Sequence, residues 1–192
     1  MQTKFILASL LLICLVPGLS GSGNPDTVKN LNFGSVGVGY GTGFFCSGGF
    51  THMVHVVGMS ISMSALWDRA NELPEDYTGF FRHDNVYTIS FRGAFGGNPD
   101  ENGNTWVGIE IGPSYVNFRK EVETPNPDYG WLYLDKYLRD NLVFHTIGLS
   151  GRLKADFMFS RNLGMEIAIG FNLNKYKSTV GIESSFLFGK LK

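Results

Sequence analysis

Residues 163–174 decide the fold, and they read Leu-Gly-Met-Glu-Ile-Ala-Ile-Gly-Phe-Asn-Leu-Asn. Large apolar side chains occupy every second position, and the positions between them hold glycine, alanine, glutamate or asparagine. Only a β-strand sorts neighbouring residues in this way, because successive side chains of a strand point to opposite sides. The stretch therefore predicts a strand with one apolar face and one small or polar face.

The same alternation recurs through most of the chain. Seven stretches predict amphipathic strands: 36–44, 53–67, 87–95, 105–118, 143–159, 163–174 and 180–189. Of their connections, 68–85 and 119–141 are long and charged, whereas 96–104, 160–162 and 175–177 are short. Alternate connections of a meander emerge at the same end, so the two long loops share one end. Long loops at one end and short turns at the other are typical of outer-membrane barrels.

The polar face of these strands distinguishes a membrane barrel from a soluble one. On a soluble barrel this face would meet water and carry many large charged side chains. Here it holds mostly glycine, serine, alanine and threonine, which suit the interior of a barrel of about eight strands. The large aliphatic face would then point outward to lipid. We therefore predict an all-β, antiparallel up-and-down transmembrane barrel. The alternative is a soluble, exported, lipocalin-like barrel that binds a small apolar ligand.

The composition of the chain agrees with a membrane barrel. Only 17% of the 192 residues are charged and 25 are glycine, whereas an ordinary soluble domain carries about 25% charged residues and about 7% glycine. Strands that face lipid explain the low charge, and a narrow interior with tight turns explains the glycine. The net charge of -1 gives no electrostatic footprint for nucleic acid.

The N-terminus predicts export. Residues 1–21 combine Lys4, a short apolar run over 5–16 and small residues near the end, which is the pattern of a cleaved signal peptide. Residues 22–33 form a lead-in, and 34–192 form the barrel. The mature chain would keep Cys46 as its single cysteine, which excludes an intramolecular disulfide.

The chain combines a secretory signal, the glycine-rich stretch Gly37-Val38-Gly39-Tyr40-Gly41 and amphipathic strands over nearly all the remaining residues. This combination is found in a known family. It resembles the small outer-membrane β-barrel proteins of the OmpA/OmpX type. In its general sequence pattern it resembles their Bacteroidetes relatives most. The resemblance implies an outer-membrane location and an even number of strands, usually eight. Because seven are visible, either 50–68 hides a break or 28–33 supplies part of another strand. The chain also lacks the terminal aromatic residue with which many such barrels end.

The charged residues on the inward-facing parity are the first candidates for function. Four acids and three bases share that parity: Arg92, Glu110, Arg152, Lys154, Asp156, Glu166 and Glu183. Charges inside a narrow barrel must pair, because an unpaired buried ion costs several kcal/mol. We predict a lumenal ion-pair network that plugs the barrel. A narrow pore is the alternative.

Aromatic side chains gather near both ends of the predicted strands on the outward parity, as expected for girdles at the membrane interfaces. The predicted girdle comprises Trp67, Tyr87, Phe95, Tyr115, Phe157, Phe159, Phe186 and Phe188.

The sequence predicts no catalytic residue, metal site or cofactor. Some small outer-membrane barrels that this chain resembles modify lipid A with a catalytic histidine or serine, so such an enzyme stays a further alternative. However, His52 and His55 are three residues apart and would face opposite sides of one strand. No serine stands two residues after His145, and no nucleophile, base and orienting acid converge in the sequence.

The loop 119–141 is the second functional candidate, because rigid barrels commonly present loops for binding. Its aromatic residues Trp131, Tyr133 and Tyr137 could contact an extracellular or envelope partner, or lie at the level of the lipid headgroups. We expect a monomer surrounded by outer-membrane lipid, with a structural or surface-interaction role.

Overall fold

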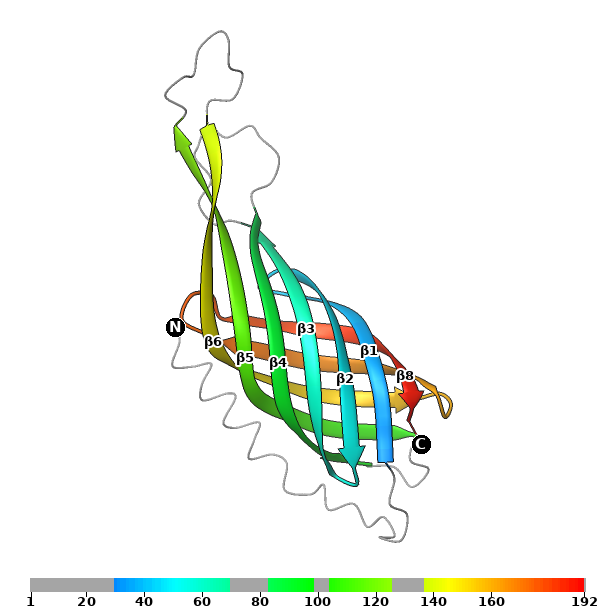
Figure 1. Ribbon diagram of the computed structural model, residues 1–192. Coiled ribbons are helices and arrows are strands. Elements are labelled where there is room, and N and C mark those ends of the chain that lie inside the picture. The colour runs from blue at the N-terminus through cyan, green and yellow to red at the C-terminus, as the bar shows by residue number, and fades with distance from the viewer. Residues whose placement is uncertain (1–29, 70–82, 99–103, 126–136, 192) are drawn as a thin grey trace.

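Eight antiparallel strands form a closed barrel in the computed structural model (Figure 1), which describes residues 30–69, 83–98, 104–125 and 137–191. The strands are β1 (Asn30–Gly41), β2 (Phe44–Val54), β3 (Val57–Arg69), β4 (His83–Gly97), β5 (Thr105–Pro125), β6 (Tyr137–Met158), β7 (Leu163–Leu173) and β8 (Thr179–Lys190). Each strand pairs with the next, and β1 pairs with β8. The predicted all-β, up-and-down barrel of eight strands is therefore confirmed. No helix among the described residues is long and apolar enough to span a membrane.

The eighth strand is β2, most of which lies between the predicted strands 36–44 and 53–67, and the stretch 53–67 itself is not one strand, because 50–68 contains a break. A two-residue turn at His55 and Val56 divides it between β2 and β3. Met53 consequently points into the lumen and is 1% exposed, whereas Met59 points outward and is 72% exposed. The prediction that both share one face is wrong, because the turn changes the parity of the chain.

The first strand also differs from its predicted bounds. β1 begins at Asn30, so the last residues of the expected lead-in are part of the barrel. Thr42 and Gly43 separate β1 from β2, which means that the predicted strand 36–44 runs across a turn. The predicted signal peptide and residues 22–29 lie outside the described residues.

The two long loops are shorter than predicted, because the strands continue into them. Residues 68–69 and 83–85 belong to β3 and β4. β5 and β6 stay paired from the Thr105–Phe157 pair to the Pro125–Tyr137 pair. They extend beyond the other strands as a two-stranded ribbon, which we call the β5–β6 ribbon (Figure 1).

Apolar side chains cover the outside of the barrel. On every strand the outward positions hold large apolar residues that are exposed, among them Val38, Phe50, Met63, Phe91, Ile111, Ile147, Ile169 and Ile182. A soluble monomer rarely exposes a contiguous apolar surface larger than a few hundred Å². The outer wall is thus built to contact an apolar medium.

Glycines keep the interior narrow along β1. Gly37 and Gly39 point inward, and a Cβ atom at Gly37 would lie 2.1 Å from the hydroxyl oxygen of Ser185. A Cβ atom at Gly39 would lie 2.2 Å from the ring of Phe45. Only glycine fits at these positions, because the space that a side chain would fill already holds residues from neighbouring strands.

Two apolar clusters fill the ends of the lumen. The lower cluster, at the end with the His55 turn, consists of Leu31, Phe33, Met53, Ala94, Trp106, Met158, Leu187 and Leu191. The upper cluster, toward the long β5–β6 ribbon, consists of Leu66, Val86, Val116 and Phe118, with Phe45 and Phe144 packed against it. The charged interior therefore lies between two apolar layers.

Candidate functional site

The structure brings all seven predicted lumenal charges together between the two apolar clusters. Arg92 comes from β4, Glu110 from β5, and Glu166 and Glu183 from β7 and β8. Arg152, Lys154 and Asp156 follow one another on the inward face of β6, because alternate residues of a strand share a face. We call these seven residues the lumenal network.

Glu110 is at the centre of the network. Its Oε2 lies 3.2 Å from Nη1 of Arg92, and its Oε1 lies 2.9 Å from Nζ of Lys154. The hydroxyl of Ser60, on β3, donates a hydrogen bond of 2.9 Å to Oε2. Glu110 is 1% exposed, so these contacts replace the water that a carboxylate needs.

Arg152 joins the acids of β7 and β8. Its Nη2 forms an ion pair with Glu166 and lies 3.1 Å from Oε2 of Glu183. Ser185 donates a hydrogen bond of 2.8 Å to Glu183, and the hydroxyl of Ser47 donates to the same carboxylate. The guanidinium group of Arg152 therefore links β6 to β7 and β8, and Glu183 extends the link to Ser47 of β2 on the opposite wall.

Lys154 anchors the network to the lower apolar cluster. Its Nζ lies 3.3 Å from Glu166 and 3.5 Å from Asp156, and it also lies 5.0 Å from the ring centroid of Phe33 and 5.3 Å from that of Trp106. An ammonium group over aromatic faces gains cation–π attraction, which is stronger where water is excluded. Lys154 is 2% exposed, so the aromatic rings and three carboxylates form its environment.

The strands that carry no network residue supply the space for it. β4 to β8 provide the long charged side chains, whereas β1 to β3 face them with Ser35, Gly37, Ser47, Gly49, Ser60 and Ser62.

Above the network, a cavity of about 70 Å³ is lined by Arg92, Arg152, Glu183 and serine side chains, and by Leu66 and Val86 of the upper cluster. A polar cavity of this size holds a few water molecules, and it is too small for a drug-sized ligand.

A second charged cluster at the mouth of the barrel was missed by the sequence analysis. Nζ of Lys177, in the connection between β7 and β8, lies 2.7 Å from Oδ2 of Asp68 and 2.9 Å from Oδ2 of Asp84. β3 and β4 lie opposite β7 and β8 in the strand order, so Lys177 reaches across the mouth. We call Lys177, Asp68 and Asp84 the mouth cluster.

The connection that carries Lys177 is held in place by its own hydrogen bonds. Oδ1 of Asn174 accepts from the backbone N–H groups of Tyr176 and Lys177, and its Nδ2 donates to the carbonyl of Lys177. The ring of Tyr176 lies 4.9 Å from that of Phe144 in the upper cluster. Partial burial lowers the pKa of Lys177, but hydrogen bonds to Asp68 and Asp84 outweigh it and raise the pKa above its usual range.

The predicted girdle residues lie on the outer wall, as their parity requires. Phe95, Phe159, Phe186 and Phe188 are exposed near the lower end of the barrel, and Phe157 is half-buried there. Trp67, Tyr87 and Tyr115 are exposed near the upper end. The sequence analysis missed two further upper residues, Phe44, which stacks on Trp67 at 6.1 Å, and Tyr40, which is 73% exposed.

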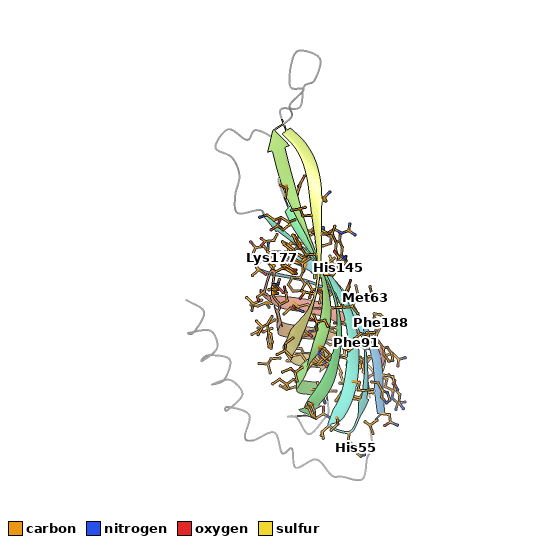
Figure 2. All side chains as sticks on the ribbon, turned by 60° about the vertical axis from the view of Figure 1, so that its left-hand side comes forward. His55, Met63, Phe91, His145, Lys177 and Phe188 are labelled. Atoms are coloured by element: carbon orange, nitrogen blue, oxygen red, sulfur yellow. The ribbon has the colours of Figure 1, made fainter. Side chains whose placement is uncertain are left out.

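The other predicted candidates do not form a site in the described residues. Trp131 and Tyr133 lie outside the described residues, and Tyr137 is described only as the first residue of β6. Figure 2 places His55 and His145 at opposite ends of the barrel. In the described part of the chain, no three histidine, cysteine, aspartate or glutamate residues are placed to hold a metal ion.

Two solved structures share this architecture. The N-terminal β-barrel domain of Pseudomonas aeruginosa OprF aligns with a TM-score of 0.55 and 10% identity, over 84% of this chain and 98% of that one. Neisserial surface protein A (NspA) aligns with a TM-score of 0.51 and 8% identity, over 83% and 94%. No family model matches the chain, and no curated protein matches its sequence. The chain therefore has the fold of a small OmpA/OmpX-type barrel.

Proposed function

We propose that this chain is an integral barrel of the outer membrane whose lumen is plugged, and that it acts as a monomer in envelope structure or surface interaction, without catalysis. The observation that carries the proposal is the reversal of the two faces. A lipocalin-like barrel turns its apolar face inward around a ligand, whereas this barrel turns its apolar face outward and its charges inward. The exposed apolar wall fits lipid, and the ion-paired interior needs no ligand.

Three layers support a closed lumen. The lower apolar cluster fills one end, the lumenal network crosses the middle, and the upper apolar cluster with the mouth cluster fills the other end. An ion on this path would have to displace paired charges and then cross apolar side chains that cannot coordinate it. The same layers favour a structural role over a narrow pore.

The β5–β6 ribbon supports a role in surface contact. Its paired strands continue beyond the rim of the barrel and end at Pro125 and Tyr137, the residues that flank the segment 126–136 in the sequence (Figure 1). Loops held by a rigid scaffold are common sites of recognition. We propose that this segment, which includes Trp131 and Tyr133, contacts an extracellular or envelope partner.

Membrane fractionation with a heat-modifiability gel tests the location. We expect the full chain in the outer-membrane fraction, with faster mobility before boiling than after it, because the folded barrel stays compact in detergent. Recovery of the folded chain in the soluble periplasmic fraction would overturn the proposal and restore the lipocalin-like alternative.

Conductance in planar bilayers tests the plug. We expect no reproducible open state from barrels whose folding the gel has verified. A steady, charge-selective conductance would replace the plug with a narrow pore.

Deletion of 128–136 tests the proposed contact. We expect normal heat-modifiable mobility together with loss of partner binding in a pull-down from envelope extracts. A deletion variant that no longer assembles would show that the segment is structural.

A further inference from the structure

A group of polar side chains stands on the mostly apolar outer wall of the barrel. It lies on β4, β5 and β6 near the upper end, at the level where Figure 2 labels His145. Tyr87 is directly opposite Asn117 in the β4–β5 pair, and Asn117 is directly opposite His145 in the β5–β6 pair. Arg119 is the next outward residue along β5, so it is a diagonal neighbour of His145, at a separation of about 7–8 Å.

The cationic group of Arg119 is held in position. Its guanidinium carbon lies 5.2 Å from the ring centroid of Tyr87, which is within the range of a cation–π contact. Arg119 itself is exposed. A guanidinium group presents paired N–H donors that match two oxygens of a phosphate.

His145 adds a second donor. Its Nδ1 lies 2.7 Å from the hydroxyl oxygen of Tyr115, and the two rings stack at 5.8 Å. When the tyrosine hydroxyl donates to Nδ1, the ring proton is on Nε2, which points away from Tyr115 and can donate to an anion. Arg119 therefore lies against Tyr87 and His145 lies against Tyr115, and both tyrosines are neighbours of Asn117 on this part of the wall.

An apolar groove begins beside this polar group. Its volume is about 390 Å³, and it extends across the outward faces of β5, β4, β3 and β2. Small residues form its floor at Cys46, Gly48 and Ala65, and Tyr87, Tyr115 and Met63 form its sides. The surface thus combines anion-binding donors with an adjoining apolar channel.

We propose that this surface binds one phosphorylated lipid, with its phosphate between Arg119 and His145 and an acyl chain in the groove. This inference rests on the proposed membrane location. Charge complementarity selects the occupant, because a neutral lipid would leave the donors of Arg119 and His145 without an acceptor. The lower end of the barrel has exposed Arg161 and Lys190, but both lie at or beyond the strand ends rather than beside a groove.

The test measures lipid binding to the purified full chain by native mass spectrometry, with lipid A carrying two phosphates and with the dephosphorylated form as probes. We expect Arg119→Gln to weaken binding of the phosphorylated lipid about tenfold, because a charge-assisted hydrogen bond is lost. Binding of the dephosphorylated lipid should stay unchanged. Arg161→Gln is the matched control, since it removes the same charge at the opposite end, and it should bind both lipids as the unmodified chain does.

A second variant keeps the test independent of Arg119. Ala65→Phe fills the floor of the groove and should weaken binding of both lipids. Equal affinity of the unmodified chain for the two lipids, or unchanged binding by Arg119→Gln, would overturn the inference, as would a second copy of the chain occupying this face. Each of these results can occur in a barrel that fractionates with the outer membrane, whereas a soluble chain would instead refute the proposed function.

Discussion

The lumenal network and the mouth cluster use the same chemistry in different surroundings. Lys154 and Glu110 have fully buried side chains, whereas the side chains of Lys177, Asp68 and Asp84 are 13–17% exposed. A buried charge that loses its partner cannot be rescued by water, but a charge near the mouth can be. We therefore expect the loss of one charge to destabilise the barrel more in the lumenal network than in the mouth cluster.

The largest expected effect is on the network. Lys154→Met removes the cation shared by Glu110, Asp156 and Glu166, and we expect the free energy of unfolding to fall by about 3–5 kcal/mol. Urea unfolding in lipid vesicles measures it. The control Lys190→Met removes an exposed lysine and should change stability by less than about 0.5 kcal/mol. Equal effects of the two variants would show that burial does not distinguish them.

A double substitution sharpens the same point. Asp156 lies 3.5 Å from Lys154, so Lys154→Met combined with Asp156→Asn removes a charge together with one of its partners. We expect the double variant to be more stable than Lys154→Met alone, with a coupling of about 1–3 kcal/mol in the double-mutant cycle. Simple additivity of the two single losses would contradict a connected network.

The mouth cluster should respond less. Lys177→Met leaves Asp68 and Asp84 facing each other, but water reaches both carboxylates, so we expect a loss of about 1 kcal/mol. Raising the salt concentration from 0.1 to 1 M should reduce this loss of stability, because salt shortens the distance over which exposed charges interact. The loss caused by Lys154→Met should stay nearly constant over the same range. A loss at Lys177 as large as that at Lys154 would remove the distinction between the two regions.

The smallest effect is the pH dependence of the mouth cluster. The pKa of Lys177 is raised in the folded chain above its ordinary value of 10.5, so the folded state holds this proton more tightly than the unfolded state does. Its contribution is therefore complete below pH 10.5 and is lost as the pH rises through the raised pKa. The stability difference between the unmodified chain and Lys177→Met should shrink in that alkaline range. A difference that grows with pH would have the wrong sign.

Much of the site could be predicted because strand parity is a local property. Residues two apart on β6 share a face in any strand, so Arg152, Lys154 and Asp156 could be placed in the lumen from the sequence alone. The apolar plugs could have been found by the same rule, since Trp106 and Phe118 have the inward parity of Glu110. They were missed because the inward face was read only for its small and charged residues.

The turn at His55 could not be predicted in the same way. Val54-His55-Val56-Val57 contains none of the glycine, asparagine or aspartate residues that mark a two-residue hairpin turn. His55 nevertheless adopts a φ of 58°, a region where non-glycine residues are uncommon. Pairing of β2 with β3 along their full length holds it there, so the tertiary structure overrides the local preference.

The sequence by itself determined most of the strands, their two faces and the inward position of the seven network charges, because alternation is set by the geometry of a single chain. Only the tertiary structure decided which charges meet. Lys177 meets Asp68 and Asp84, more than ninety positions earlier in the chain, because closure of β1 on β8 sets the width of the mouth. Arg119 meets Tyr87 because the register between β4 and β5 brings them together. Such contacts depend on register and closure, which no local pattern encodes.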